Sequence, residues 1–175
     1  MSSDQDYSRY IGLTAPPTTA ALPLEQDTLR RFVQATMDDD PVYYDEEVAS
    51  ASKYGAICAP PLYPLHAFRR ASGTADPLDA IIENRDADGA GDGADAYYGL
   101  EHIKVPFNRI LNGGLEVESY RCLRKGEKAV ASPRYSKVTP KKGSSGDFLL
   151  VTIETRFTTE AGELLMISRH TMVWR

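Results

Sequence analysis

The sequence predicts an α+β fold in which helices come first and an antiparallel sheet follows. Apolar residues in the first half recur at helical spacing. From Tyr97 onward the chain instead shows strand-like alternation interrupted by turn signals. The length of 175 residues fits one domain over residues 1–175, long enough to bury a core without disulfides or metals. The helices are therefore expected to pack on one face of a meander of strands.

Four segments of the first half carry local signals. Tyr10–Leu22 contains glycine and a proline pair, which predicts an irregular entry into a short strand. The apolar spacing predicts an amphipathic helix over Glu25–Met37, and a capping aspartate predicts a second helix over Asp45–Lys53. Pro61 is tolerated in a first helical turn, so a longer apolar helix is expected from there to about Ala71.

The second half predicts strands joined by short turns. The strands are expected at Leu115–Tyr120, Arg134–Thr139, Phe148–Thr158 and Leu164–Trp174, with turns at Lys125–Gly126, Lys142–Gly146 and Ala161–Gly162. Before them, residues 73–98 form an insertion in which Asp86–Asp95 alternates aspartate with glycine. The terminal glutamate of a calcium loop is missing, so we expect an acidic loop and no metal site.

Charge and cysteine content exclude several classes of protein. The net charge of -5 argues against a nucleic-acid or anionic-membrane surface, and no apolar run is long enough to span a bilayer. Lys137, Lys141 and Lys142 are more typical of a solvated hairpin than of a phosphate site. Cys58 and Cys122 have neither metal nor redox spacing, which favours reduced core thiols in a cytoplasmic protein without a cofactor.

The ordered motifs of the chain resemble one known family. They are Ile11–Gly12, Asp38–Asp45, Tyr54–Pro61, Leu111–Gly114 and Arg121–Glu127. In this order they are similar to the MaoC-like dehydratases, in particular the N-terminal, fatty-acid-synthase-type dehydratase domain. The resemblance implies a hot-dog fold, a long antiparallel sheet wrapped around a central helix, paired as a double hot-dog dimer. It also implies reversible hydration of a 2-enoyl thioester of coenzyme A or acyl carrier protein.

Two working parts of that family's site are replaced in this sequence. Asp38 is the catalytic carboxylate that the resemblance implies, but Tyr43 stands where the family has histidine. A phenol with a pKa of about 10 is a poor general base at neutral pH. Pro60 and Pro61 replace a His-Gly pair whose glycine N–H points at the thioester carbonyl, and proline has no N–H. The resemblance places substrate binding at Tyr43, Tyr44, Pro61, Leu62, Asn112 and Gly113.

The three histidines do not restore the missing base in this interpretation. His66 is expected as a buried, hydrogen-bonded core imidazole, and His102 and His170 as ordinary strand residues. A weaker alternative is that His102 folds over the cleft and substitutes for the missing histidine.

These replacements favour one hypothesis over two alternatives. The favoured hypothesis is a catalytically degenerate, substrate-channel subunit of a heteromeric double hot-dog hydratase, whose MaoC-like partner supplies the catalytic pair. The insertion at 73–98 would then shape the acyl space. The first alternative is a self-sufficient homodimeric enoyl-CoA hydratase that uses Asp38 with Tyr43 or Tyr44 as donor. The second is a non-catalytic module that binds acyl thioesters.

Overall fold

The computed structural model describes residues 6–68, 73–75, 82–83, 97–107, 109–144 and 146–175. The acidic segment Asp86–Asp95 lies outside the described residues, as does most of the insertion at 73–98. Within the described ranges, no helix is long and apolar enough to cross a membrane.

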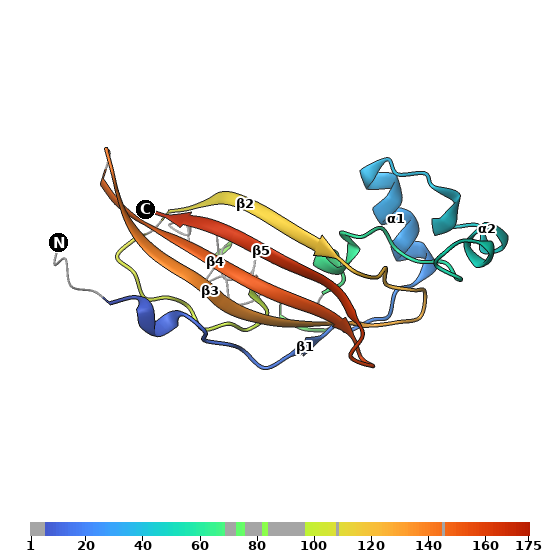
Figure 1. Ribbon diagram of the computed structural model, residues 1–175, viewed down its shortest axis with the longest axis horizontal. Coiled ribbons are helices and arrows are strands. Elements are labelled where there is room, and N and C mark those ends of the chain that lie inside the picture. Colours follow the sequence, from blue (N-terminus) through green and yellow to red (C-terminus); the bar gives the residue numbers. More distant parts are fainter. Residues whose placement is uncertain (1–5, 69–72, 76–81, 84–96, 108, 145) are drawn as a thin grey trace.

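One antiparallel sheet of five strands forms the body of the protein (Figure 1). Its strands are β1 (Thr18–Thr19), β2 (Ile110–Ser119), β3 (Ala129–Gly143), β4 (Gly146–Thr159) and β5 (Leu164–Trp174), in the spatial order β1-β3-β4-β5-β2. The predicted α+β class is confirmed, and β5 has the predicted bounds. The predicted basic hairpin is the connection between β3 and β4, where Gly143 pairs with Gly146.

Strand β3 is longer than predicted and includes two prolines that lie just outside the predicted range. The expected strand, Arg134–Thr139, lies between Pro133 and Pro140, and both belong to β3. The N–H of Tyr135 points away from β4 and donates to the Leu13 carbonyl at 3.0 Å. Pro133 is two residues earlier and has the same orientation, so its missing N–H costs no hydrogen bond to β4.

The helices before the sheet are short. They are η1 (Ser8–Tyr10), α1 (Gln26–Thr36), η2 (Pro41–Tyr43), α2 (Glu46–Ala51) and η3 (Tyr63–His66). Helices α1 and α2 confirm the two predicted helices, and the Asp45 side chain caps α2 by accepting from the N–H groups of Glu47 and Val48. Met37 does not join the buried face of α1, because it takes a left-handed conformation at the helix end and is 89% exposed.

The long central helix predicted from Pro61 to about Ala71 is wrong in its described part. Only the 3-10 turn η3 forms there, held by bonds from Leu65 N to the Leu62 carbonyl and from Ala67 N to the Pro64 carbonyl. Pro64 explains the difference, since its ring would clash with the preceding turn of an α-helix and it has no N–H to donate. Residues 69–71 lie outside the described ranges.

The core is divided between the two ends of the sheet. Helices α1 and α2 gather at one end and do not cover its middle (Figure 1). There, Leu29 and Val33 of α1 pack with Phe157 and Met166 of the sheet. Toward the other end, the segment around Leu100 and Ile103 packs on strand residues that include Tyr135, Leu149 and Val151.

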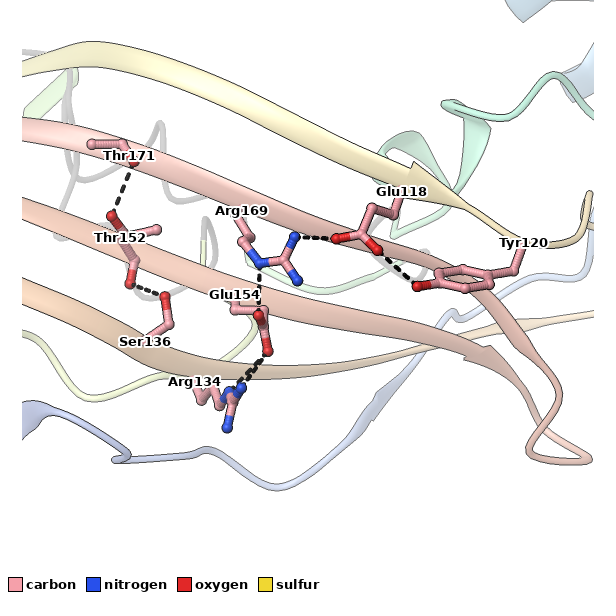
Figure 2. Close-up of polar contacts among 8 residues, drawn as sticks. All are labelled: Glu118, Tyr120, Arg134, Ser136, Thr152, Glu154, Arg169 and Thr171. Atoms are coloured by element: carbon pink, nitrogen blue, oxygen red, sulfur yellow. Dashed lines mark hydrogen bonds and ion pairs between the residues drawn. The ribbon is translucent and has the colours of Figure 1, made fainter.

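A ladder of charged side chains crosses four strands of the sheet (Figure 2). Glu154 of β4 is only 8% exposed and accepts from Arg134 of β3 at 2.6 Å and from Arg169 of β5 at 2.8 Å. Arg169 also contacts Glu118 of β2. Two guanidinium groups therefore compensate the buried carboxylate, and the ladder stabilises the register of the strands that carry it.

Candidate functional site

The end of α1 turns the chain so that Asp38 and Tyr43 face each other. Met37 has a φ of 54°, and the Asp38 N–H bonds back to the Val33 carbonyl at 3.0 Å. The 3-10 turn η2 follows, capped by Asp40, whose carboxylate accepts from the Val42 N–H at 3.0 Å. As a result the Tyr43 hydroxyl donates to Asp38 Oδ2 at 3.1 Å.

Tyr43 is held as a neutral donor. Burial, followed by the charge of Asp38, raises the pKa of the Tyr43 phenol above its ordinary value. A phenol with a raised pKa stays protonated near neutral pH. It therefore cannot take a proton from water. The Tyr44 hydroxyl donates elsewhere, to the Asp39 carbonyl at 3.3 Å. The phenol of Tyr43 is therefore a hydrogen-bond donor to Asp38 and not a general base.

Asp38, Tyr43 and Tyr44 lie together in one cleft. Its volume is about 540 Å³, and it is lined by Gln26, Arg30, Val33, Gln34, Met37, Asp38, Asp39, Tyr43 and Tyr44. Among the described residues that line it there is no histidine. The buried Gln26 Oε1 at this cleft has no hydrogen-bond partner, although its amide nitrogen donates to the Tyr43 carbonyl.

The histidines lie in other surroundings. His66 is exposed and its ring lies 5.1 Å from that of Phe32, so the prediction of a buried core imidazole is wrong. The turn η3 is too short to carry its last residue into the core. His102 contacts Tyr97 in a segment without regular secondary structure, and its buried Nε2 has no hydrogen-bond partner. His170 is a β5 residue, as expected, and its Nε2 lies 3.3 Å from Asn112 Oδ1.

The other predicted substrate-binding residues do not converge on Asp38 within one chain. Pro61 lines a second pocket, and Asn112 lines a third with His170. Leu62 is 47% exposed beside η3. Gly113 is the extra residue of a bulge in β2, because Asn112 pairs with Met172 and Gly114 with Thr171. Asp38, Tyr43 and Tyr44 are thus brought together, and the remaining positions are distributed over the chain.

The second pocket contains two residues that the sequence did not connect. It has a volume of about 480 Å³ and is lined by Lys53, Tyr54, Cys58, Pro61, Ser119, Tyr120, Arg121, Cys122 and Arg124. Cys58 and Cys122 both line it, although their separation in sequence gave no signal of contact. A bidentate ion pair closes the turn after Cys122: Arg121 donates to Glu127 at 2.7 and 2.5 Å. Within the described residues, no group of three histidine, cysteine or acidic side chains could hold a metal ion.

Known proteins resemble the chain along most of its length. Residues 9–168 match the family described as FAS1-like, dehydratase domain region. A UPF0336 protein from Saccharopolyspora erythraea is 26% identical over 166 residues, which cover 95% of this chain and 89% of that protein.

Solved structures show the same architecture. A chain of the ChsH1-ChsH2 complex from Mycobacterium tuberculosis has a TM-score of 0.65 at 22% identity, with 91% of this chain and 83% of that chain covered. A MaoC-like dehydratase from Rhodospirillum rubrum has a TM-score of 0.57 at 20% identity, with coverage of 94% and 91%. These likenesses confirm the predicted hot-dog fold.

Proposed function

The chain belongs to the FAS1-like dehydratase domain region family, and on that premise we propose that it is one component of an acyl-thioester hydratase or 3-hydroxyacyl dehydratase. In this proposal it is the catalytically degenerate subunit that lines the substrate channel. A MaoC-like partner contributes the catalytic Asp-His pair and the donor to the thioester carbonyl. A cytoplasmic location, with the thioester carried on coenzyme A or acyl carrier protein, is part of the proposal.

The hydrogen bond from Tyr43 to Asp38 carries this proposal. Hydration of an enoyl thioester requires a group that removes a proton from water and a donor where enolate charge develops. The phenol already donates a hydrogen bond to Asp38 Oδ2 at 3.1 Å and has a raised pKa. Pro60 and Pro61 have no N–H, and the Tyr63 N–H is used by the Pro60 carbonyl at 2.9 Å. Losing a general base typically costs about 10²- to 10⁴-fold in rate, so the lone chain is expected to be slow.

The exposed edge of β2 supports a partner subunit. Within the described part of the sheet, β2 pairs with β5 and has no strand on its other side. Ile110, Leu111 and Leu115 of this strand are 41%, 41% and 47% exposed. A long edge strand with exposed apolar side chains is a template for a second sheet. The ChsH1-ChsH2 structure is itself a complex of two named components.

Activity of the lone chain and of a reconstituted heteromer tests the proposal. We would assay 2-enoyl-CoA hydration by the purified chain alone and after co-expression with a MaoC-like subunit that retains Asp and His. Turnover is expected only in the heteromer, and Asp38→Asn in this chain is expected to change that turnover only modestly.

Two contrary results would select the alternatives. High turnover by the lone chain that collapses on Asp38→Asn identifies a self-sufficient homodimer. Binding of acyl thioester without turnover beside any partner identifies a binding module.

A further inference from the structure

Two thiols meet in the second pocket, on the same face of a short antiparallel pairing. Cys58 is fully buried and Cys122 is partly exposed. Cys58 pairs with Arg124, flanked by bonds from Ala59 N to the Leu123 carbonyl at 2.8 Å and from Lys125 N to the Ile57 carbonyl at 3.0 Å. Cys122 is two residues before Arg124, so its side chain projects to the same face as that of Cys58.

The two thiols lie close together at this pocket. Both line it, Cys122 packs against the buried cluster that contains Cys58, and hydrogen bonding between the two thiols shifts the pKa of each. The contact does not depend on a mobile surface loop, because the backbone bonds on both sides of Cys58 fix the two segments against each other.

The surroundings distinguish the two thiols chemically. The hydrogen bond from Cys58, followed by the charge of Lys53, lowers the pKa of Cys122 to about 7. The same hydrogen bond, together with burial, raises the pKa of Cys58. Cys122 is therefore the thiol that ionises first, and it is the one that a reagent can reach from the pocket.

We propose that Cys58 and Cys122 are a thiol-oxidation site that forms a reversible intramolecular disulfide, with Cys122 attacking first and Cys58 resolving. The Cys122 thiolate attacks one sulfur of a small disulfide, which forms a mixed disulfide and releases one thiolate. Cys58 then gives its proton to that leaving group or to solvent and attacks the Cys122 sulfur, which expels the second thiolate. Two protein thiols are oxidised by two electrons, and the small disulfide is reduced to two thiols.

The charge of the pocket indicates an anionic oxidant of the glutathione class. Arg121 is engaged by Glu127 and by Glu163 at 3.3 Å, so its charge is already compensated. Lys53 lies over the Tyr54 ring at 5.0 Å, and Arg124 donates to the Tyr54 carbonyl, an uncharged acceptor. The charge of Arg124 also acts on the Glu127 carboxylate, so Lys53 is the cation that supplies positive charge beside Cys122. A disulfide that carries carboxylates is therefore attracted to the pocket, and the proposal does not depend on hydration chemistry.

Redox titration of the purified full chain tests the site. The chain is equilibrated with mixtures of oxidised and reduced glutathione, trapped with maleimide, digested and analysed by mass spectrometry. We expect a linked pair of peptides that contain Cys58 and Cys122, with loss of two hydrogens from the intact chain and full recovery of both thiols in dithiothreitol. A wild-type chain that keeps glutathione on Cys122 while Cys58 stays free overturns the proposal, as does a chain in which neither thiol reacts.

Two matched variants assign the roles of the thiols. Cys58→Ser is expected to accumulate the mixed disulfide on Cys122, and Cys122→Ser is expected to slow glutathionylation of the remaining thiol by roughly tenfold or more, since thiolate character and access set reactivity. Equal reactivity of the two variants overturns the assignment. If a variant does not fold, timed iodoacetamide labelling of the wild type replaces it. Cys122 must then react first, with a midpoint near pH 7, and simultaneous labelling of both thiols contradicts the proposal.

Discussion

The cleft at Asp38 and the pocket at Cys58 shift the pKa of a weakly acidic side chain in opposite directions. In the cleft, the phenol of Tyr43 lies 3.1 Å from a carboxylate, and burial with that charge raises its pKa. In the pocket, the thiol of Cys122 receives hydrogen bonds and lies near Lys53, and its pKa is lowered to about 7. Both side chains are partly buried residues at the same end of the sheet. The partner of each group, and not burial alone, decides which of them can react.

This difference separates a cleft with a neutral phenol donor from a pocket with a readily ionised thiol within one chain. The cleft keeps the geometry of a carboxylate with a hydroxyl, but its described lining contains no histidine. The pocket has a partly exposed thiol and shares with the expected substrate-binding residues only Pro61. Changing the charged or titrating partner in each place should therefore alter one site and leave the other unchanged.

Restoring an imidazole to the cleft should have the largest effect. Tyr43→His places a base of suitable pKa beside Asp38, and we expect the lone chain to hydrate a 2-enoyl-CoA about 10²-fold faster, measured as loss of enoyl-thioester absorbance. Tyr44→His is the control, because Tyr44 bonds to the Asp39 carbonyl and not to Asp38. An equal gain in both variants would show that position 43 has no special relation to the carboxylate.

A change outside both sites should affect stability alone. Burial would raise the pKa of Glu154, but hydrogen bonds from Arg134 and Arg169 outweigh it and lower that pKa. The ladder therefore stabilises the fold above the ordinary pKa of a glutamate, about 4.5, and this stabilisation is lost as pH falls through the lowered pKa of Glu154. Glu154→Gln should cost about 2 kcal/mol at neutral pH in urea unfolding and weaken the acid dependence. Altered Cys122 labelling in this variant would show that the sheet and the pocket are coupled.

Removing the donor from the cleft should have a smaller effect. Tyr43→Phe leaves Asp38 without its hydrogen bond and should cost about 1 kcal/mol in urea unfolding at neutral pH. The phenol has a raised pKa in the folded chain, so its stabilisation is present at neutral pH and is lost as pH rises past about 10, where the unfolded chain ionises. The stability of wild type and variant should therefore converge at high pH. A gap that widens instead would mean that Tyr43 ionises readily in the folded protein.

The smallest effect is expected from neutralising a cation at the pocket. Lys53→Met should lower the rate of Cys122 alkylation at neutral pH by roughly twofold, because an exposed charge is strongly screened. Lys125→Met is the control, since Lys125 lies 3.3 Å from Glu46 and outside the pocket lining. The same loss in both variants would indicate a response to net charge and not to Lys53.

Local chemistry explains which parts of the structure could be predicted. Helix α2 follows from the capping side chain of Asp45, and the contact between Asp38 and Tyr43 joins residues only five positions apart. Pro64 limited the predicted central helix to one 3-10 turn. The sequence pattern alone did not show whether Pro61 would begin a helix or Pro64 would end it. The contact of Cys58 with Cys122 depends on pairing between segments far apart in the sequence. The periodicity of apolar residues gives no information about such pairing.

The bulge in β2 affects how the exposed edge of the sheet can pair with another strand. A Cβ on Gly113 would lie 3.0 Å from the Thr171 carbonyl oxygen, so a larger residue there would push β2 and β5 apart locally. The extra residue shifts the hydrogen-bonding groups of the outer edge out of step on its two sides. A foreign strand that matches one half of that edge therefore mismatches the other half, which disfavours continuous edge-to-edge pairing along β2.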